Sequence, residues 1–209
     1  LIVWVTDAVD AGAARELAQL PGVLQVEAGR RVSVRSVNGS HSENALIDGN
    51  ARVPLLQRVI DVDSRHVAAG PMGLLMTDRL AAKLGLSPGD TVRVEVREGR
   101  RQVLDVVVER TVRNMMGMSA YLEREALNRL LQDGDVANFF SLRVGARELP
   151  AVLLATMAMP RVAGVFSKST MLRNMQEISA RNVLIMSSIL TAFAVVIAVG
   201  VVYNSARIA

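Results

Sequence analysis

The feature that most constrains this chain is a long uncharged run near its C-terminal end. Residues 183–203 contain no Asp, Glu, Lys or Arg. At about 1.5 Å per residue, a helix over this run would be about 31 Å long, which matches the hydrocarbon core of a bilayer. We therefore predict a transmembrane helix over residues 183–203.

The segment before this run continues the helical pattern. Residues 169–182 contain no Pro or Gly, and Met171, Met175 and Ile178 recur at helical spacing. We predict that the same helix begins outside the membrane as a stalk over 169–182. Residues 204–209 would then begin a cytoplasmic coupling region.

Small side chains form a stripe within the predicted span. Ser187, Thr191, Ala194 and Ala198 are spaced so that they share one side of a helix. Small residues allow helices to approach closely in lipid, whereas a lone anchor needs no such stripe. The stripe therefore predicts packing against other transmembrane helices. The span has no ionisable residue, so it provides no path for ions or protons.

The N-terminal part indicates a repeated β-α-β unit. A strand at 1–5, a helix at 10–20 and a strand at 23–27 are followed much later by a strand at 139–144, a helix at 147–157 and a strand at 162–166. Pro21 follows Val5 at the same interval as Pro160 follows Val144. We expect residues 1–38 and 118–168 to form one ferredoxin-like sheet.

The chain between the two β-α-β units, from which we assign residues 39–117 to a separate lobe, has a different pattern. Short strand candidates at 31–37, 44–48, 56–62, 92–96 and 103–112 alternate with turns, and short helices are expected at 76–84 and 121–131. This pattern predicts an inserted β-rich lobe. The fold class is therefore α+β, with a discontinuous domain followed by a long stalk and transmembrane helix.

Composition excludes several classes of function. The net charge is +4, and aromatic residues are only 3% of the chain, so the stacking platform of a single-stranded nucleic-acid binder is missing. Cysteine is absent, which excludes thiolate metal sites and disulfides. No phosphate-binding, dinucleotide-binding, zinc-protease or nucleophile-elbow motif occurs. We expect no catalytic activity, no cofactor, no metal site and no nucleic-acid partner.

Three weaker signals leave alternatives open. Ser40, His41 and Ser42 suggest a nucleophile and base, but they are typical of an exposed turn. Asp48, Asp61 and Asp63 offer too few oxygen ligands for a hard cation. Methionine is abundant and fits core packing, an adaptable apolar groove or a copper(I) site, the relevant residues being Met72, Met76, Met115, Met116, Met118, Met157 and Met159.

Residues 74–96, 115–131 and 201–209 together resemble the FtsX-like permease subunits of MacB/LolE-type ABC transporters. The resemblance implies that residues 1–182 are extracytoplasmic, at the inner (cell) membrane, and that the C-terminus is cytoplasmic. It also implies a separate ATPase subunit and further transmembrane helices as partners. Tyr203, Asn204 and Arg207 match the approach to the ATPase-docking helix.

The resemblance implies a mechanism in which the stalk transmits ATPase-driven motion to the outer domain. That domain would move or release lipid, lipoprotein, peptide or drug, with a groove near Met115, Met116 and Met118 as a candidate cargo site. One alternative is an FtsX-like regulator whose outer domain switches a cell-wall or other envelope protein. An extracytoplasmic enzyme on a single anchor is disfavoured by the missing catalytic motifs.

Overall fold

The computed structural model describes residues 1–114, 117–167, 179, 182–194 and 197–198. The chain divides into two units, residues 1–166 and 167–209. Among the described residues, no helix is both long enough and apolar enough to cross a membrane. The predicted span falls partly outside them, at 195–196 and 199–203, as does most of the predicted stalk and all of 204–209.

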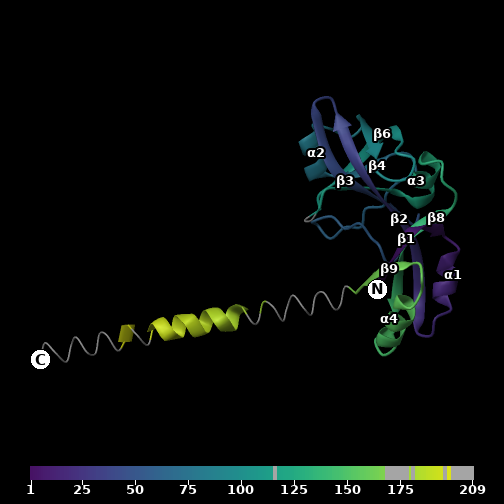
Figure 1. The fold of residues 1–209 in the computed structure, drawn as a ribbon. Helices are drawn as coiled ribbons and strands as arrows, with labels where there is room; N and C mark the ends of the chain where they lie inside the picture. The colour runs from purple at the N-terminus through teal and green to yellow at the C-terminus, as the bar shows by residue number, and fades with distance from the viewer. Residues whose placement is uncertain (115–116, 168–178, 180–181, 195–196, 199–209) are drawn as a thin grey trace, which may run out of the picture. The chain divides into compact units, whose positions relative to one another are not determined.

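The first unit contains a four-stranded sheet covered by two helices, which we call the sheet lobe (Figure 1). Its strands lie in the order β9-β1-β8-β2, and each neighbouring pair is antiparallel. The elements are β1 (Ile2–Asp10), α1 (Ala13–Ala18), β2 (Val23–Asn38), β8 (Val136–Val144), α4 (Leu149–Met157) and β9 (Val162–Phe166).

One apolar core holds the sheet lobe together. Leu17 of α1 and Val152 of α4 are buried in the same cluster as Val3 and Phe140 of the central strands. Both helices therefore cover the same face of the sheet. Asp10, expected to begin α1, instead ends β1, and its carboxylate accepts a hydrogen bond from the Gly12 amide at 2.7 Å.

The rest of the first unit, together with the second half of β2, forms a closed ring of paired strands, which we call the ring lobe. Six strands follow one another in the order β2-β3-β7-β4-β6-β5, and β5 pairs with β2 again. Two short helices belong to this lobe. Its further elements are β3 (His41–Asn50), β4 (Leu74–Thr77), α2 (Asp78–Leu84), β5 (Thr91–Val96), β6 (Val103–Val112), β7 (Ser119–Glu123) and α3 (Arg124–Leu130).

The ring lobe has its own core of mainly Val and Leu side chains, including Val32, Leu74, Val92 and Leu122. Two of its strand pairs are parallel, β3 with β7 and β4 with β6. Parallel pairs cannot be joined by tight turns. Strand β3 therefore reaches β7 only after the segment 51–73 and strands β4 to β6, and β4 reaches β6 through α2 and β5. The two lobes thus have separate cores.

Strand β2 belongs to both lobes. Its residues 23–29 pair with β8 of the sheet lobe, and its residues 30–38 pair with β3 of the ring lobe. With 16 residues, it extends over about 53 Å at the usual rise of about 3.3 Å per residue. One covalent strand therefore connects the two hydrogen-bonded sheets.

The structure corrects three further local predictions. Met76 and Thr77 end β4 instead of beginning α2, and residues 121–123 lie in β7 instead of α3. In both places the chain enters a buried strand of the ring before the helix begins, so tertiary pairing overrides the helical pattern. Residues 56–62 form no strand, apart from the isolated bridge between Ile60 and His66.

Candidate functional site

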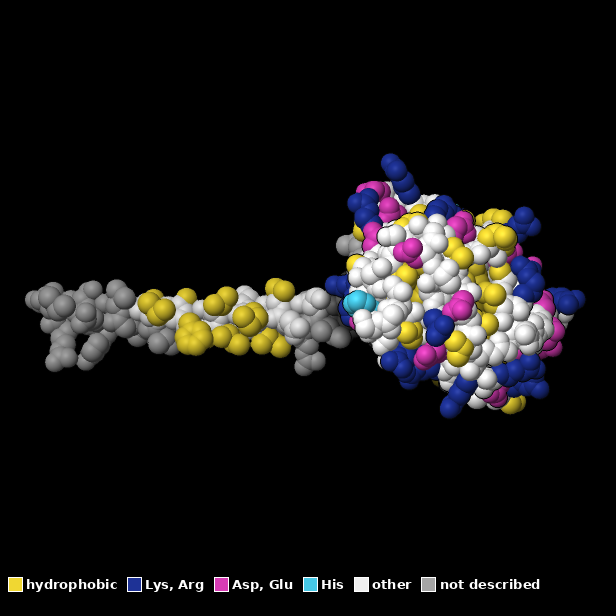
Figure 2. All heavy atoms as spheres, turned by 90° about the horizontal axis from the view of Figure 1, so that it is seen from above, with side chains coloured by type: hydrophobic (Ala, Val, Ile, Leu, Met, Phe, Trp, Pro, Cys, Tyr) yellow, Lys and Arg dark blue, Asp and Glu magenta, His cyan; other side chains and the backbone are white. Residues whose placement is uncertain are grey.

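The described helix of the second unit, residues 182–194, is apolar around its circumference. The consecutive side chains of Val183, Leu184, Ile185 and Met186 are all exposed, Val183 and Leu184 by 68% each. In Figure 2, apolar side chains dominate this helix, whereas charged side chains are spread over the visible face of the first unit. A helix that is apolar on all sides requires an apolar environment.

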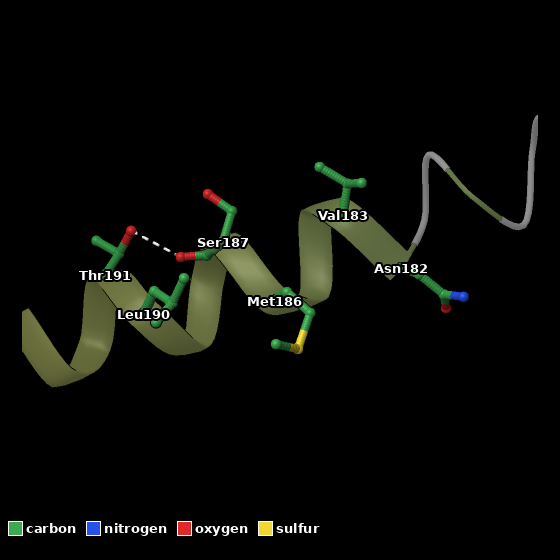
Figure 3. A pocket seen from close by; sticks show the side chains of 6 residues that line it. All are labelled: Asn182, Val183, Met186, Ser187, Leu190 and Thr191. Carbon is green, nitrogen blue, oxygen red and sulfur yellow. Dashed lines mark hydrogen bonds between the residues drawn. The ribbon is translucent and has the colours of Figure 1, made fainter.

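Two hydroxyl groups on this helix are satisfied within the helix itself. Ser188 Oγ donates to the Leu184 carbonyl oxygen at 2.8 Å. Thr191 Oγ1 donates to the Ser187 carbonyl oxygen at 2.8 Å (Figure 3). Because these donors are already paired, both side chains suit surroundings that offer no water.

The predicted stripe of small residues borders a shallow groove on the helix. Val183, Ser187 and Thr191 project from one side and Met186 and Leu190 from the next, along an open and nearly flat surface (Figure 3). Ala194 lies in the same helical segment, and Ala198 is also helical. Tyr203, Asn204 and Arg207 lie outside the described residues.

The candidate methionine groove is only partly described, because Met115 and Met116 lie outside the described residues. Met118 packs against the ring-lobe core, where Met76 is fully buried. Met159 packs against the core of the sheet lobe, while Met72 and Met157 are exposed. The described methionines therefore belong to different parts of the unit.

The acidic residues considered for a cation have arginine partners. Asp48 is buried and forms a two-pronged ion pair with Arg31, one branch of which measures 2.9 Å. Asp63 pairs with Arg113 at 2.6 Å, and Asp61 lies 3.9 Å from the same guanidinium. Within the described ranges, no cluster of three or more His, Cys, Asp or Glu residues is suited to hold a metal.

The sheet face opposite the helices carries an aromatic cluster. The Trp4 and Phe139 rings have centroids 5.0 Å apart. The Arg31 guanidinium carbon lies 4.9 Å from the Trp4 centroid and 5.8 Å from the Phe139 centroid, a cation–π arrangement. The same guanidinium holds Asp48 of β3, so this cluster joins the sheet lobe to the ring lobe.

A segment of the ring lobe is also tied to the sheet lobe by Glu27 of β2. Its carboxylate accepts hydrogen bonds from the backbone amides of Leu55, Leu56 and Gln57 at 2.5, 2.9 and 3.2 Å. The Gln57 side chain donates to Ser141 Oγ of β8 at 2.8 Å. Residues 55–57 are thereby fixed to β2 and β8 through polar groups.

A buried arginine stands where β2 passes from one lobe to the other. Arg30 lies 3.4 Å from Asp133, before β8, and 3.7 Å from Glu98, in the β5–β6 turn. Burial raises the pKa of the Glu98 carboxyl, and the charge of Arg30 opposes this shift while that of Asp133 adds to it. The cluster joins β2, the β5–β6 turn and the loop before β8.

A cavity of about 590 Å³ lies on the helix-covered face of the sheet lobe. Its wall is mostly aliphatic, with Val5, Val9 and Met159 among the lining residues. Two acidic and two basic residues also line it: Asp10, Glu16, Arg15 and Arg161. Sequence reasoning missed it, because the cavity forms between residues far apart in the chain.

The comparisons with known proteins give the fold. No protein-family model matches the sequence, and no curated protein matches it. Among solved structures, the extracellular domain of the noncanonic ABC-type transporter YknZ from Gram-positive bacteria has a TM-score of 0.53 at 15% identity, covering 73% of this chain and 87% of that one. The periplasmic region of MacB from Actinobacillus actinomycetemcomitans has a TM-score of 0.51 at 10% identity, covering 84% and 91%.

The predicted resemblance is therefore confirmed at the level of fold. This chain has the architecture of the extracytoplasmic domains of YknZ and MacB, which are ABC-type transporter proteins.

Proposed function

We propose that the chain is a permease segment of an ABC transporter. Motion driven by a separate ATPase subunit passes through the stalk (169–182) and the transmembrane helix (183–203) to an extracytoplasmic domain. That domain then moves or releases a lipid, lipoprotein, peptide or drug. The fold shared with YknZ and MacB supports this proposal, as does the helix with apolar exposed side chains and internally bonded hydroxyls.

The observation that carries the proposal is a hydrogen-bonded path through the first unit. The last strand of that unit, β9, pairs with the central strand β1, with Ile2 opposite Phe166. Strand β1 pairs with β8, which pairs with β2, and β2 continues into the ring lobe. A displacement of Phe166 would thus reach the ring lobe through paired strands, without crossing a flexible linker.

We also propose the domain arrangement expected from the sequence. Residues 1–38 and 118–168 supply the strands and helices of a ferredoxin-like lobe and residues 39–117 form an insertion, while residues 30–38, β7 and α3 pack beside the insertion in the ring lobe. The antiparallel order β9-β1-β8-β2 supports this assignment, because it corresponds to the order 4-1-3-2 when these four strands are counted along the chain. The insertion leaves between the second and third of these strands, at the far end of β2.

The partners follow from the same proposal. Tyr203, Asn204 and Arg207 lead to the ATPase, and Ser187, Thr191, Ala194 and Ala198 pack against the remaining transmembrane helices of this or a partner permease. The protein would lie in the inner (cell) membrane with residues 1–182 outside the cytoplasm. The aliphatic cavity of the sheet lobe and the region of Met115, Met116 and Met118 are the candidate cargo sites.

The test is to break the proposed lever in the assembled transporter. Replacing Ser179 and Ala180 by Gly and Pro would introduce a hinge and absorb the motion. We expect ATP hydrolysis and assembly to persist while cargo release is lost. The control exchanges the two residues, Ser179→Ala with Ala180→Ser, which keeps helix-compatible side chains. Full cargo release by the Gly-Pro variant would refute the lever.

A further inference from the structure

The buried Arg30 faces more negative charge than it can balance. Its guanidinium lies 3.4 Å from the Asp133 carboxylate and 3.7 Å from the Glu98 carboxylate. Glu98 belongs to the turn between β5 and β6, and Asp133 belongs to the loop between α3 and β8. One positive charge therefore stands between two carboxyl groups from segments that are distant in the sequence.

The members of this cluster are not fully hydrogen-bonded. Arg30 Nε and Glu98 Oε1 are both buried, and neither has a hydrogen-bond partner among the described residues. The 3.7 Å between Glu98 and Arg30 is too long for a hydrogen bond. An ionised carboxylate oxygen that is buried without a hydrogen bond is costly. Glu98 is therefore the member of the cluster whose charge the fold accommodates least well.

The other charged side chains beside Glu98 do not offset this cost. Arg100 and Arg101, in the same turn, line the small cavity that borders the cluster. Both are exposed, so solvent weakens their effect on the buried carboxyl. Burial raises the pKa of Glu98, the charge of Arg30 lowers it, and the charge of Asp133 raises it, with a net upward shift.

We propose that Glu98 is a pH-sensitive switch, which keeps the β5–β6 turn (97–102) docked on β2 and on the loop after α3 when it is protonated and loosens this turn when it is ionised. A proton on Glu98 removes its repulsion from Asp133 and leaves the charge of Arg30 to Asp133 alone. The protonated carboxyl also costs less to bury than the carboxylate. Ionisation reverses both effects.

Protons favour the docked turn because the docked state binds them more tightly. In a loosened turn Glu98 is exposed to solvent, and its pKa returns toward the ordinary value of 4.5. Docking is therefore strongest at low pH and weakens as pH rises from about 4.5 through the raised pKa. The switch depends only on the first unit, whereas its use as a sensor of the surroundings rests on the proposed extracytoplasmic location.

Hydrogen exchange in the turn measures this docking. The Arg97 amide donates to the Ser33 carbonyl oxygen of β2 at 2.9 Å, so its protection reports whether the turn lies against β2. We would measure exchange in the full chain in detergent micelles between about pH 4 and pH 7 and divide each rate by the intrinsic rate at that pH. Protection at residues 97–102 should fall several-fold as pH rises.

Three variants assign the pH dependence to Glu98. Glu98→Gln carries a neutral amide of nearly the same shape, so protection should stay high over the whole range. Asp133→Asn removes only the repulsion, so the fall should become smaller. The matched control is Glu95→Gln on β5, which breaks the partly exposed pair with Arg35 at 3.8 Å and should keep the wild-type fall.

Two results would overturn the proposal. One is wild-type protection at 97–102 that stays constant or rises with pH. The other is a Glu98→Gln chain that keeps the wild-type fall. Neither measurement involves cargo or ATP hydrolysis, so failure of the switch is distinguishable from failure of the proposed lever.

Discussion

Replacing Gly29 by alanine tests whether the aromatic cluster is packed as tightly as its geometry indicates. Gly29 is buried in β2 directly opposite Phe139 of β8. A Cβ atom at this position would lie 2.1 Å from Phe139 Cζ and 2.4 Å from Cε2. Real carbon atoms do not approach this closely, so the Phe139 ring must move away from β2.

The cost follows from what that movement disturbs. The Phe139 ring contacts Trp4 and lies beneath the Arg31 guanidinium. An aromatic pair contributes about 0.5–1.5 kcal/mol beyond its burial, and overpacking a core costs about 1–3 kcal/mol. We expect Gly29→Ala to lower the free energy of unfolding by about 2–4 kcal/mol. For a domain of this size, this corresponds to a fall in Tm of roughly 5–15 °C.

Trp4 is the sole tryptophan of the chain, so its fluorescence reports directly on this cluster. Thermal and denaturant unfolding would be followed by Trp4 emission in the full chain in detergent micelles. Gly164→Ala is the matched control, because Gly164 lies opposite Trp4 on the other side and a Cβ there meets no atom. Its effect should stay within about 0.5 kcal/mol. Equal stability of Gly29→Ala and Gly164→Ala would refute the packing argument.

Two other changes test the ties between the lobes. Glu27→Ala leaves three backbone amides without their acceptor. We expect the free energy of unfolding to fall by about 1–3 kcal/mol and hydrogen exchange at residues 55–57 to become faster. The control Glu43→Ala removes the ion pair with Lys83 and should leave that exchange unchanged. Glu98 has a raised pKa in the folded state, so the native state binds its proton more tightly and the contribution of Glu98 to stability falls as pH rises from about 4.5 through the raised pKa. Relative to wild type, Glu98→Gln should therefore gain stability across that window, and a constant difference in Tm would contradict the assignment.

The parts of the fold that local chemistry determines could be predicted. Pro21 and Gly22 end the α1 region, and Pro160 separates α4 from β9 as expected. Gly39, in the turn between β2 and β3, adopts a φ of +55°, which glycine tolerates without cost. The turn at 87–90 is closed by the Asp90 carboxylate, which accepts a hydrogen bond from the Ser87 amide at 2.7 Å. Each of these signals is contained within a few residues.

The closure of the ring could not be predicted, because it depends on contacts between distant residues. Asp48 stands opposite Tyr121 in the parallel pair of β3 with β7, and no local sequence pattern predicts this strand pairing. The apolar residues of 121–131 fit a helix as well as a strand followed by a helix. Only the burial of Leu122 in the ring core decides between the two.

The features of the candidate site also divide into those that local sequence predicts and those that depend on distant contacts. The stripe of Ser187 and Thr191 was predictable, because residues four apart on a helix lie on one side. The ties made by Glu27 and Arg31 were not, since a charged residue on a strand usually faces solvent and its partner is chosen by the tertiary fold. The one sequence signal for the cluster of Trp4, Phe139 and Arg31 was Trp4 itself, the single tryptophan in a chain poor in aromatic residues.

The ties at the lobe junction determine how a displacement of β9 would be transmitted. Four residue pairs connect β9 with β1, from Ile2–Phe166 to Val5–Val162, so a pull along the strand direction loads these pairs together instead of one at a time. At the junction, Asn138 bonds the amide and the carbonyl of Arg31, each at 2.7 Å. Because both backbone groups of Arg31 are held by β8, β2 cannot bend there without breaking two hydrogen bonds. Transmitted motion should therefore turn the ring lobe together with the sheet lobe, and a hinge at Arg31 is the arrangement that these contacts oppose.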